Sequence, residues 1–88
     1  MAIIYISFKI TRPFQAWAET FDNDQAQLNR DGITTLTRGY LLDDPTQVRI
    51  VMRAPSLAVL EANMAANSDT INDSGHVIES TVLEVFSE

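Results

Sequence analysis

The chain has 88 residues with no cysteine, one histidine and a formal net charge of -6, from 6 lysines and arginines against 12 aspartates and glutamates. This charge repels phosphate backbones and anionic lipid surfaces, so neither nucleic acid nor a membrane is expected as a partner. Without cysteine, and with one histidine, the chain can build neither a disulfide framework nor a closed zinc site made of protein ligands alone.

The length fits one domain, residues 1–88, and a hydrophobic fraction of 45% argues against disorder. The apolar start, residues 2–10, is too short to span a bilayer and lacks the basic region and cleavage site of a signal peptide, so we expect a cytoplasmic protein. A domain this small buries only somewhat more than roughly 60% of the surface of its unfolded chain. Covering a sheet face with a second copy would thicken that core.

Residues 3–10 alternate as a half-buried strand does. One face is wholly apolar and carries Ile4, Ile6, Phe8 and Ile10. The other face is mixed and carries Ile3, Tyr5, Ser7 and Lys9. We expect helices to cover the apolar face, and a second sheet or a ligand cavity to lie against the mixed face.

Residues 11–13 end this strand and open a helix, because Thr11 can cap free N–H groups and Pro13 is tolerated in a first helical turn. The apolar residues that follow recur at helical spacing: Phe14, Trp17, Ala18, Phe21 and Leu28. Residues 22–24 are poor helix formers, so we expect a kink or a second short turn near Asp22. Gly32 is expected to end the segment in a left-handed conformation.

Residues 33–42 and 47–53 are predicted to be strands, joined by a turn at residues 43–46 into an antiparallel hairpin. Alternation in the later strand sets Val48, Ile50 and Met52 against Arg49, Val51 and Arg53. Ser56 is expected to cap a second helix. The buried stripe of that helix is predicted to be Leu57, Leu60 and Met64. Residues 68–74 are polar apart from Ile71, and form either a last helical turn or a loop that ends at Gly75.

Residues 77–86 are predicted to be a final strand with apolar side chains on both faces. Alternation places Val77, Leu83 and Val85 on one face, and Ile78, Val82 and Phe86 on the other. An edge strand of this kind is an aggregation hazard unless a partner chain covers it, which favours a homodimer. The order β-α-β-β-α-β with right-handed crossovers predicts an α+β, ferredoxin-like fold, in which a four-stranded antiparallel sheet carries two helices on one face.

Three side chains on the predicted helices and loops are candidates for chemistry. His76 has an ordinary pKa near neutrality, so it is a candidate acid, base or metal ligand, and otherwise a residue at the start of a strand. Asp22 is a candidate general base if burial raises its pKa, and otherwise a helix cap or the ion-pair partner of Arg30. Trp17 is a candidate pocket wall, although aromatic side chains at helical spacing are also ordinary core.

The mixed face of the predicted sheet gathers three cations and two hydroxyls: Lys9, Arg49, Arg53, Tyr5 and Ser7. The cations could hold a small carboxylate or phenolate, with the hydroxyls orienting it. The alternative is that the cations pair with Glu79, Glu84 or acidic residues of a second subunit. The chain has no phosphate-binding glycine loop, nucleophile elbow or metal motif, so we expect no metal and no cofactor.

Three stretches of the chain resemble small proteins of the dimeric α+β barrel superfamily: Trp17-x-x-x-Phe21-Asp22, Arg30-x-Gly32-Ile33 and Asp43-Asp44-Pro45-x-x-Val48. The resemblance covers residues 5–86 in element order. It implies two sheets that face each other across a dimer, with a cavity between each sheet and its helices or neighbouring loops. The superfamily includes families of unknown function, cofactor-free monooxygenases, haem-degrading enzymes, polyketide cyclases and isomerases.

The chain departs from the haem-degrading members of this superfamily. Those members have a histidine near the end of the second helical segment, an asparagine on the first strand and a tryptophan that shapes the pocket. Here His76 lies in a comparable stretch, but Ser7 stands on the first strand and Trp17 is on the first helix.

We therefore expect a homodimer that binds a small aromatic or anionic organic molecule. The first alternative is a cofactor-independent monooxygenase, cyclase or isomerase, in which His76 or Asp22 moves a proton and Tyr5 orients the substrate. The second alternative is a structural or regulatory dimer in which protein fills both faces of the sheet.

Overall fold

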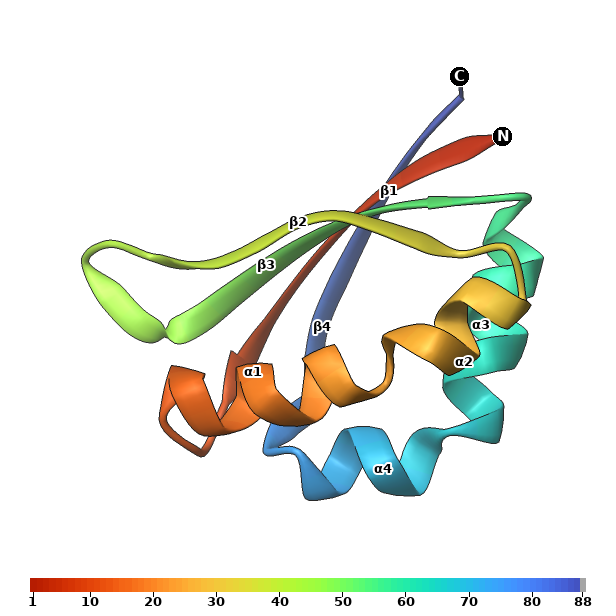
Figure 1. Cartoon of the computed structure of the whole chain (residues 1–88). Helices are drawn as coiled ribbons and strands as arrows, with labels where there is room; N and C mark the ends of the chain where they lie inside the picture. The colour runs from red at the N-terminus through yellow and green to blue at the C-terminus, as the bar shows by residue number, and fades with distance from the viewer. Residues whose placement is uncertain (88) are drawn as a thin grey trace.

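A computed structural model of the chain describes residues 1–87 and has one sheet whose helices all lie on the same face (Figure 1). The elements follow in the order β1 (Ala2–Ile10), α1 (Phe14–Asn23), α2 (Gln25–Arg30), β2 (Thr34–Leu41), β3 (Asp44–Ala54), α3 (Leu57–Ala66), α4 (Ser68–Asp73) and β4 (His76–Ser87). The strands lie in the order β2-β3-β1-β4, and all neighbours are antiparallel. The predicted ferredoxin-like fold is confirmed, with each predicted helical segment divided into two helices.

The register of the sheet explains where the core lies. β1 runs between β3 and β4, with Ile6 opposite Ile50 on one side and Leu83 on the other. Alternation then turns one set of β1 and β3 side chains toward the helices, and each of them is at most 4% exposed: Ile4, Ile6, Phe8, Ile10, Val48, Ile50 and Met52. Trp17 and Leu60 pack on this layer from the helices, so the predicted apolar faces of β1 and β3 are confirmed.

The first helical segment breaks at Asp24, which confirms the kink predicted near Asp22. Asp24 has φ of -92° and ψ of -2°, and its N–H donates to the carbonyl of Phe21 at 3.1 Å. The tighter hydrogen bond ends α1 and lets α2 continue in a new direction. Gly32 closes the segment with φ of 79°, the left-handed conformation that glycine adopts without strain.

The two predicted helix caps have different outcomes. Ser56 caps α3 as predicted, because its hydroxyl accepts a hydrogen bond from the N–H of Val59 at 3.2 Å. Thr11 does not cap α1, since Pro13 occupies the capping position. The N–H and the hydroxyl of Thr11 instead donate to the carbonyl of Gly75, at 2.8 and 3.4 Å. These bonds join the end of β1 to the start of β4.

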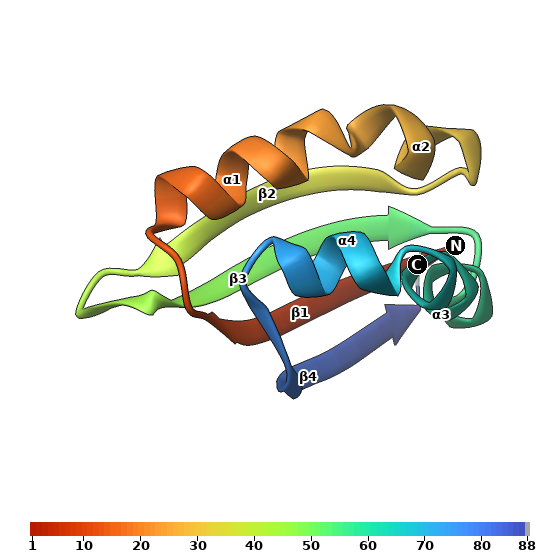
Figure 2. The ribbon, with the colours of Figure 1, turned by 90° about the horizontal axis from the view of Figure 1, so that it is seen from below.

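Residues 68–73 form helix α4, which decides between the two expectations for this stretch. The helix has six residues, and none of them is buried. Figure 2 shows that α4 lies across the sheet on the same side as α1. No helix within residues 1–87 is long and apolar enough to cross a membrane.

The predicted hairpin of β2 and β3 is confirmed, but its turn is shorter than expected. The turn consists of residues 42–43 instead of 43–46, because Leu41 already pairs with Asp44. The register then shifts, and the carboxylate of Asp44 accepts hydrogen bonds from the N–H and the hydroxyl of Thr46 at 3.0 and 2.6 Å. Such a side-chain turn replaces ladder bonds lost at the shift.

A bulge interrupts β4 and changes which faces its residues occupy. Ser7 pairs with Val82, whereas Lys9 pairs with Val77, so two steps along β1 correspond to five along β4. The hydroxyl of Ser80 stabilises this bulge, since it accepts from the N–H of Lys9 at 2.8 Å and donates to the carbonyl of Val77 at 2.6 Å.

The bulge corrects the predicted faces of the final strand. Cross-strand partners share a face, so Val77 lies with Val82 on the side of the sheet away from the helices. The prediction that Val77 shares a face with Leu83 and Val85 is therefore wrong. Simple alternation fails here because three extra residues between the paired positions shift the phase of the strand by an odd number.

Candidate functional site

A cavity of about 70 Å³ lies between the sheet and the helices. Its floor is apolar and comes from β1 and β3: Ile6, Phe8, Ile50 and Met52. Three polar side chains that line it are themselves buried: Asn63, Ser74 and His76. Within residues 1–87, no three His, Asp or Glu side chains come together as they would to hold a metal ion. An apolar space with a few placed polar groups is typical of a site for a small organic molecule.

Aromatic rings form one wall of the cavity. Trp17 and Phe21 are one helical turn apart on α1, and their rings stack with centroids 4.9 Å apart. The Trp17 ring also lies 5.5 Å from Phe8 on the floor. The Phe8 ring in turn stacks on the imidazole of His76, with centroids 3.7 Å apart and planes 8° from parallel. The flat faces of these rings give this wall planar apolar surface, and Trp17 lies among the residues that line the cavity.

His76 is the first residue of β4 and is 7% exposed. The bulge in β4 brings the hydroxyl of Thr81 within 2.7 Å of its Nε2 atom. Burial lowers the pKa of the imidazole to about 4, so the ring is neutral near pH 7. The sequence identified His76 as a candidate but gave no signal for Thr81, because their contact depends on the bulge.

A network of amides closes the cavity between α2 and α3. Asn63 is 4% exposed, and its Nδ2 atom donates to Gln27 Oε1 and Asp31 Oδ2, both at 2.8 Å. Gln27 Nε2 donates in turn to Asp24 Oδ2 at 3.0 Å. Mutually bonded buried groups of this kind fix the two helices against each other. Asn63 was not among the predicted site residues, although an asparagine three residues after Leu60 on the apolar stripe was an available signal.

Asp22 lies outside the lining of the cavity. Its carboxylate accepts two hydrogen bonds from Arg38, from Nε at 2.8 Å and from Nη2 at 2.7 Å, which join α1 to β2. The expected pairing with Arg30 is therefore wrong. The hydrogen bonds that Arg38 donates to this carboxylate raise the pKa of Arg38, whose guanidinium also lies 5.6 Å from the centroid of the Phe14 ring. A role for Asp22 as a base stays a prediction, and this geometry places its carboxylate in a surface ion pair with Arg38.

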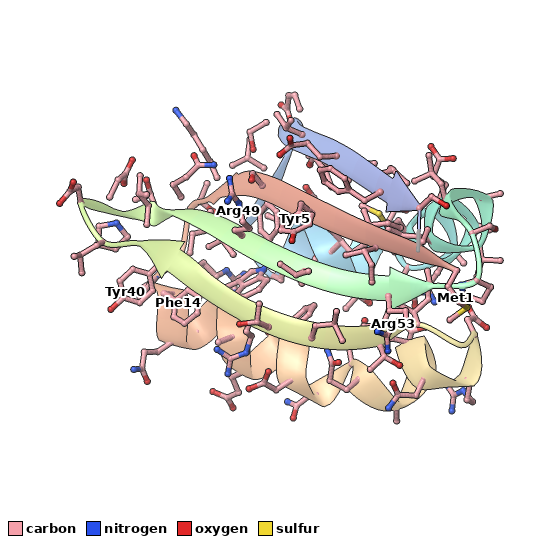
Figure 3. The ribbon with its side chains drawn as sticks, turned by 90° about the horizontal axis from the view of Figure 1, so that it is seen from above. Met1, Tyr5, Phe14, Tyr40, Arg49 and Arg53 are labelled. Atoms are coloured by element: carbon pink, nitrogen blue, oxygen red, sulfur yellow. The ribbon has the colours of Figure 1, made fainter. Side chains whose placement is uncertain are left out.

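The other five predicted residues lie on the open face of the sheet, which carries no helix: Tyr5, Ser7, Lys9, Arg49 and Arg53. Figure 3 looks onto this face, with Tyr5 and Arg49 near its centre. Arg49 Nε donates to the hydroxyl of Ser7 at 3.2 Å, and the Tyr5 ring packs edge-on against Phe86 at 5.3 Å. The sheet separates these residues from His76 and Trp17, so the predicted residues do not form one site.

The chain matches one known protein family over its whole length. A family model described as "Domain of unknown function (DUF3764)" matches residues 1–88. No curated protein is significantly similar to the chain in sequence.

Solved structures match the chain over nearly its full length at low identity. A proposed antibiotic biosynthesis monooxygenase from Bordetella bronchiseptica has a TM-score of 0.76 and 9% identity, covering 99% of this chain and 96% of that one. A protein of the same description from Nitrosomonas europaea has a TM-score of 0.68 and 16% identity, covering 100% and 98%. SnoaB from Streptomyces nogalater, named as a cofactor-independent oxygenase, has a TM-score of 0.70 and 11% identity, covering 99% and 91%. The likeness shows the fold, and it agrees with the predicted ferredoxin-like arrangement of a four-stranded antiparallel sheet with helices on one face.

The buried neutral His76 predicts how stability depends on pH. The folded pKa of about 4 lies below the ordinary value of 6.5, so the unfolded chain binds a proton that the folded chain does not between these values. Lowering the pH from 7 to 4 should therefore remove roughly 2 kcal/mol of unfolding free energy through this residue, after allowance for solvent screening. The measurement is urea denaturation of the wild type and of His76→Gln across this range. His76→Gln removes the titrating imidazole and no other ionisable group, so parallel pH curves would contradict the assignment.

Proposed function

We propose that this chain, which belongs to the family described as Domain of unknown function (DUF3764), binds a small planar aromatic molecule between its sheet and its helices, as a homodimer joined through the open face. One observation supports the ligand class above all: the cavity has the stacked rings of Trp17 and Phe21 as a wall and the ring of Phe8 as its floor. The proposed ligand class is narrower than the one expected from the sequence, which included anionic as well as aromatic molecules.

The charges around the cavity favour a neutral guest. No lysine or arginine lines it among the residues that the structure describes, whereas Asp24 does. The neutral imidazole of His76 can exchange a hydrogen bond with a phenol or a carbonyl group, and the amide oxygen of Asn63 can accept one from a phenol. A carboxylate or phosphate would lose its hydration there without gaining a cation. Two cationic side chains, Lys9 and Arg49, lie on the open face of the sheet, away from the cavity.

The open face supports the dimer. Val82 and Phe86 of β4 lie on this face and are 58% and 52% exposed in the single chain. Glu84 pairs with Tyr5 in register and so lies on the same face, near the cations of β1 and β3. A face with apolar residues and both signs of charge can be complementary to a second copy of itself.

A second candidate function is cofactor-independent oxygenation in the same cavity. Two observations favour it: the fold likeness to SnoaB, and a buried imidazole that is unprotonated near pH 7 beside the aromatic wall. Without a cofactor the substrate itself must reduce O₂, so an activated CH₂ group would become a carbonyl with one oxygen atom while the other leaves as water. The lowered pKa that keeps His76 neutral also makes it a weak base, which is why binding is the leading proposal.

The ligand proposal predicts saturable quenching of the single tryptophan, Trp17, by 1,4-naphthoquinone, a flat molecule that does not fluoresce. Met64→Phe enlarges a side chain that lines the cavity, and should weaken the Kd at least about tenfold, which is 1.4 kcal/mol. Ala62→Phe adds the same ring on the exposed side of α3 and serves as the control. Equal affinity in all three proteins would place the quinone elsewhere. A stable dimer that binds no aromatic compound would favour a purely structural association.

The dimer proposal predicts that the wild type sediments as two chains at micromolar concentration. Phe86→Glu should shift the protein to a single chain, because it would bury one new charge per subunit at the interface. Ala62→Glu, on the exposed side of α3, should leave the dimer intact. Circular dichroism would verify that each variant folds. A wild type that stays monomeric at millimolar concentration would refute the dimer.

The oxygenase candidate predicts O₂ consumption with anthrone, whose CH₂ group lies between aromatic rings and conjugates with a carbonyl. His76→Gln should lower the rate by about 10²-fold or more, the usual contribution of a positioned proton acceptor. Asp22→Asn tests the other predicted base. We expect it to change the rate little, because the carboxylate of Asp22 is paired with Arg38 outside the lining of the cavity. An oxygen electrode, with the protein-free rate subtracted, measures both. A rate insensitive to His76→Gln would reject this candidate.

A further inference from the structure

We infer that helix α4 is the movable wall of the cavity, and that its residue Ile71 sets the size of the molecule that the cavity admits. This inference rests on the proposed function for the identity of the guest, and on the structure alone for the movement. Its evidence comes from the size of the cavity, the unequal packing of its walls and the two ends of α4.

The size of the cavity requires a movement. About 70 Å³ is less than the roughly 150 Å³ of an engineered cavity that binds benzene, and far less than the roughly 300 to 1,000 Å³ of typical ligand pockets. A planar aromatic molecule therefore enters only if one wall moves outward.

Three of the four walls are firmly held. The floor belongs to the paired strands β1 and β3, and its side chains are at most 4% exposed. On α1, Trp17 is 2% exposed, stacks on Phe21 and packs at a tilt against Phe8. On the side of α2 and α3, Leu60 is 1% exposed, and Asn63 ties the two helices together by its hydrogen bonds to Gln27 and Asp31.

The wall formed by α4 is held weakly. The helix has no buried residue, and no side chain caps its N-terminus. Its one apolar side chain, Ile71, is half-buried and lines the cavity together with Thr70 and with Ser74, the residue that follows the helix. Segments with few buried apolar contacts are the ones that open at low free-energy cost.

The two ends of α4 suit a hinge. Gly75 has φ of 96°, a region that side chains rarely adopt, and its carbonyl is anchored to the N–H of Thr11 at 2.8 Å. At the other end, Asn67 leaves helical geometry with φ of -114° and ψ of 22°. A change of torsion angles at these two residues would swing α4 outward while α3 and β4 keep their places. Figure 2 shows α4 lying between its links to α3 and β4, on the helical side of the sheet.

Ile71 controls both the closed state and the space inside it. Removing its side chain beyond Cβ enlarges the cavity and weakens closure. Each buried methylene favours the closed state about fourfold, so Ile71→Ala, which removes three carbons that are half-buried, should raise the open population roughly five- to tenfold.

The test uses Trp17, the single tryptophan of the chain, which lines the cavity and is 2% exposed. Acrylamide must pass the moving wall to quench it, so Ile71→Ala should raise the quenching constant roughly five- to tenfold. Asn72→Ala is the matched control, since it shortens an exposed side chain of the same helix that does not line the cavity. Ile71→Val, which removes one carbon, should fall between, and keeps the inference testable if Ile71→Ala unfolds. Equal quenching constants for Ile71→Val, Asn72→Ala and the wild type would overturn the inference.

A second measurement addresses size selection. The wild type should favour phenol over 1,4-naphthoquinone more strongly than Ile71→Ala does, as measured by calorimetric Kd values. The same ratio in both proteins would overturn the role of Ile71 in selection. If acrylamide quenching rises as expected but neither compound binds any variant, the movable wall stands and the proposed function fails.

Discussion

β1 is paired on both sides, with β3 and with β4, and this double pairing determines what each face of the sheet carries. Ile6 lies opposite Ile50 on the helical side, whereas Ser7 lies opposite Arg49 on the open side. A slip of one residue would exchange the two faces, so the apolar residues of β1 hold the register as firmly as the hydrogen bonds do. The cavity and the proposed dimer surface are consequences of this one alignment, on opposite sides of the same layer.

The bulge in β4 is the second feature on which the site depends. It brings Thr81 to the Nε2 atom of His76, and the ring of Phe8 stacks on the face of that imidazole. A buried histidine is tolerated because one ring nitrogen has a hydroxyl partner and because the neutral form dominates near pH 7. The edge strand thereby supplies one of the few buried polar groups of a mainly apolar cavity, and an uninterrupted ladder would have turned this side chain to the open face.

Four short helices cover the sheet where the ferredoxin-like plan requires two. The break at Asp24 lets α2 turn toward α3, where Gln27 meets Asn63. The second break, at Asn67, leaves α4 with a single apolar anchor, Ile71. Each of α1, α2 and α3 has residues buried against the rest of the chain, whereas α4 has none. The cavity and its weakly held wall have the same cause. The short polar helix α4 cannot fill the space that a longer apolar helix would fill.

Local patterns in the sequence determined the element order, the apolar faces of β1 and β3, the break near Asp22, and the ends at Gly32 and Ser56. These features depend on alternation, helical spacing and backbone preference, which act between near neighbours in the chain. Sequence reasoning also selected His76 and Trp17, but grouped them with residues such as Tyr5 that lie across the sheet. Only the tertiary structure decided that Arg38 pairs with Asp22, that Thr81 reaches His76, and that Asn63 joins α2 to α3. Each of those contacts depends on a bulge, a register shift or a helix crossing, and none of these leaves a periodic trace in the sequence.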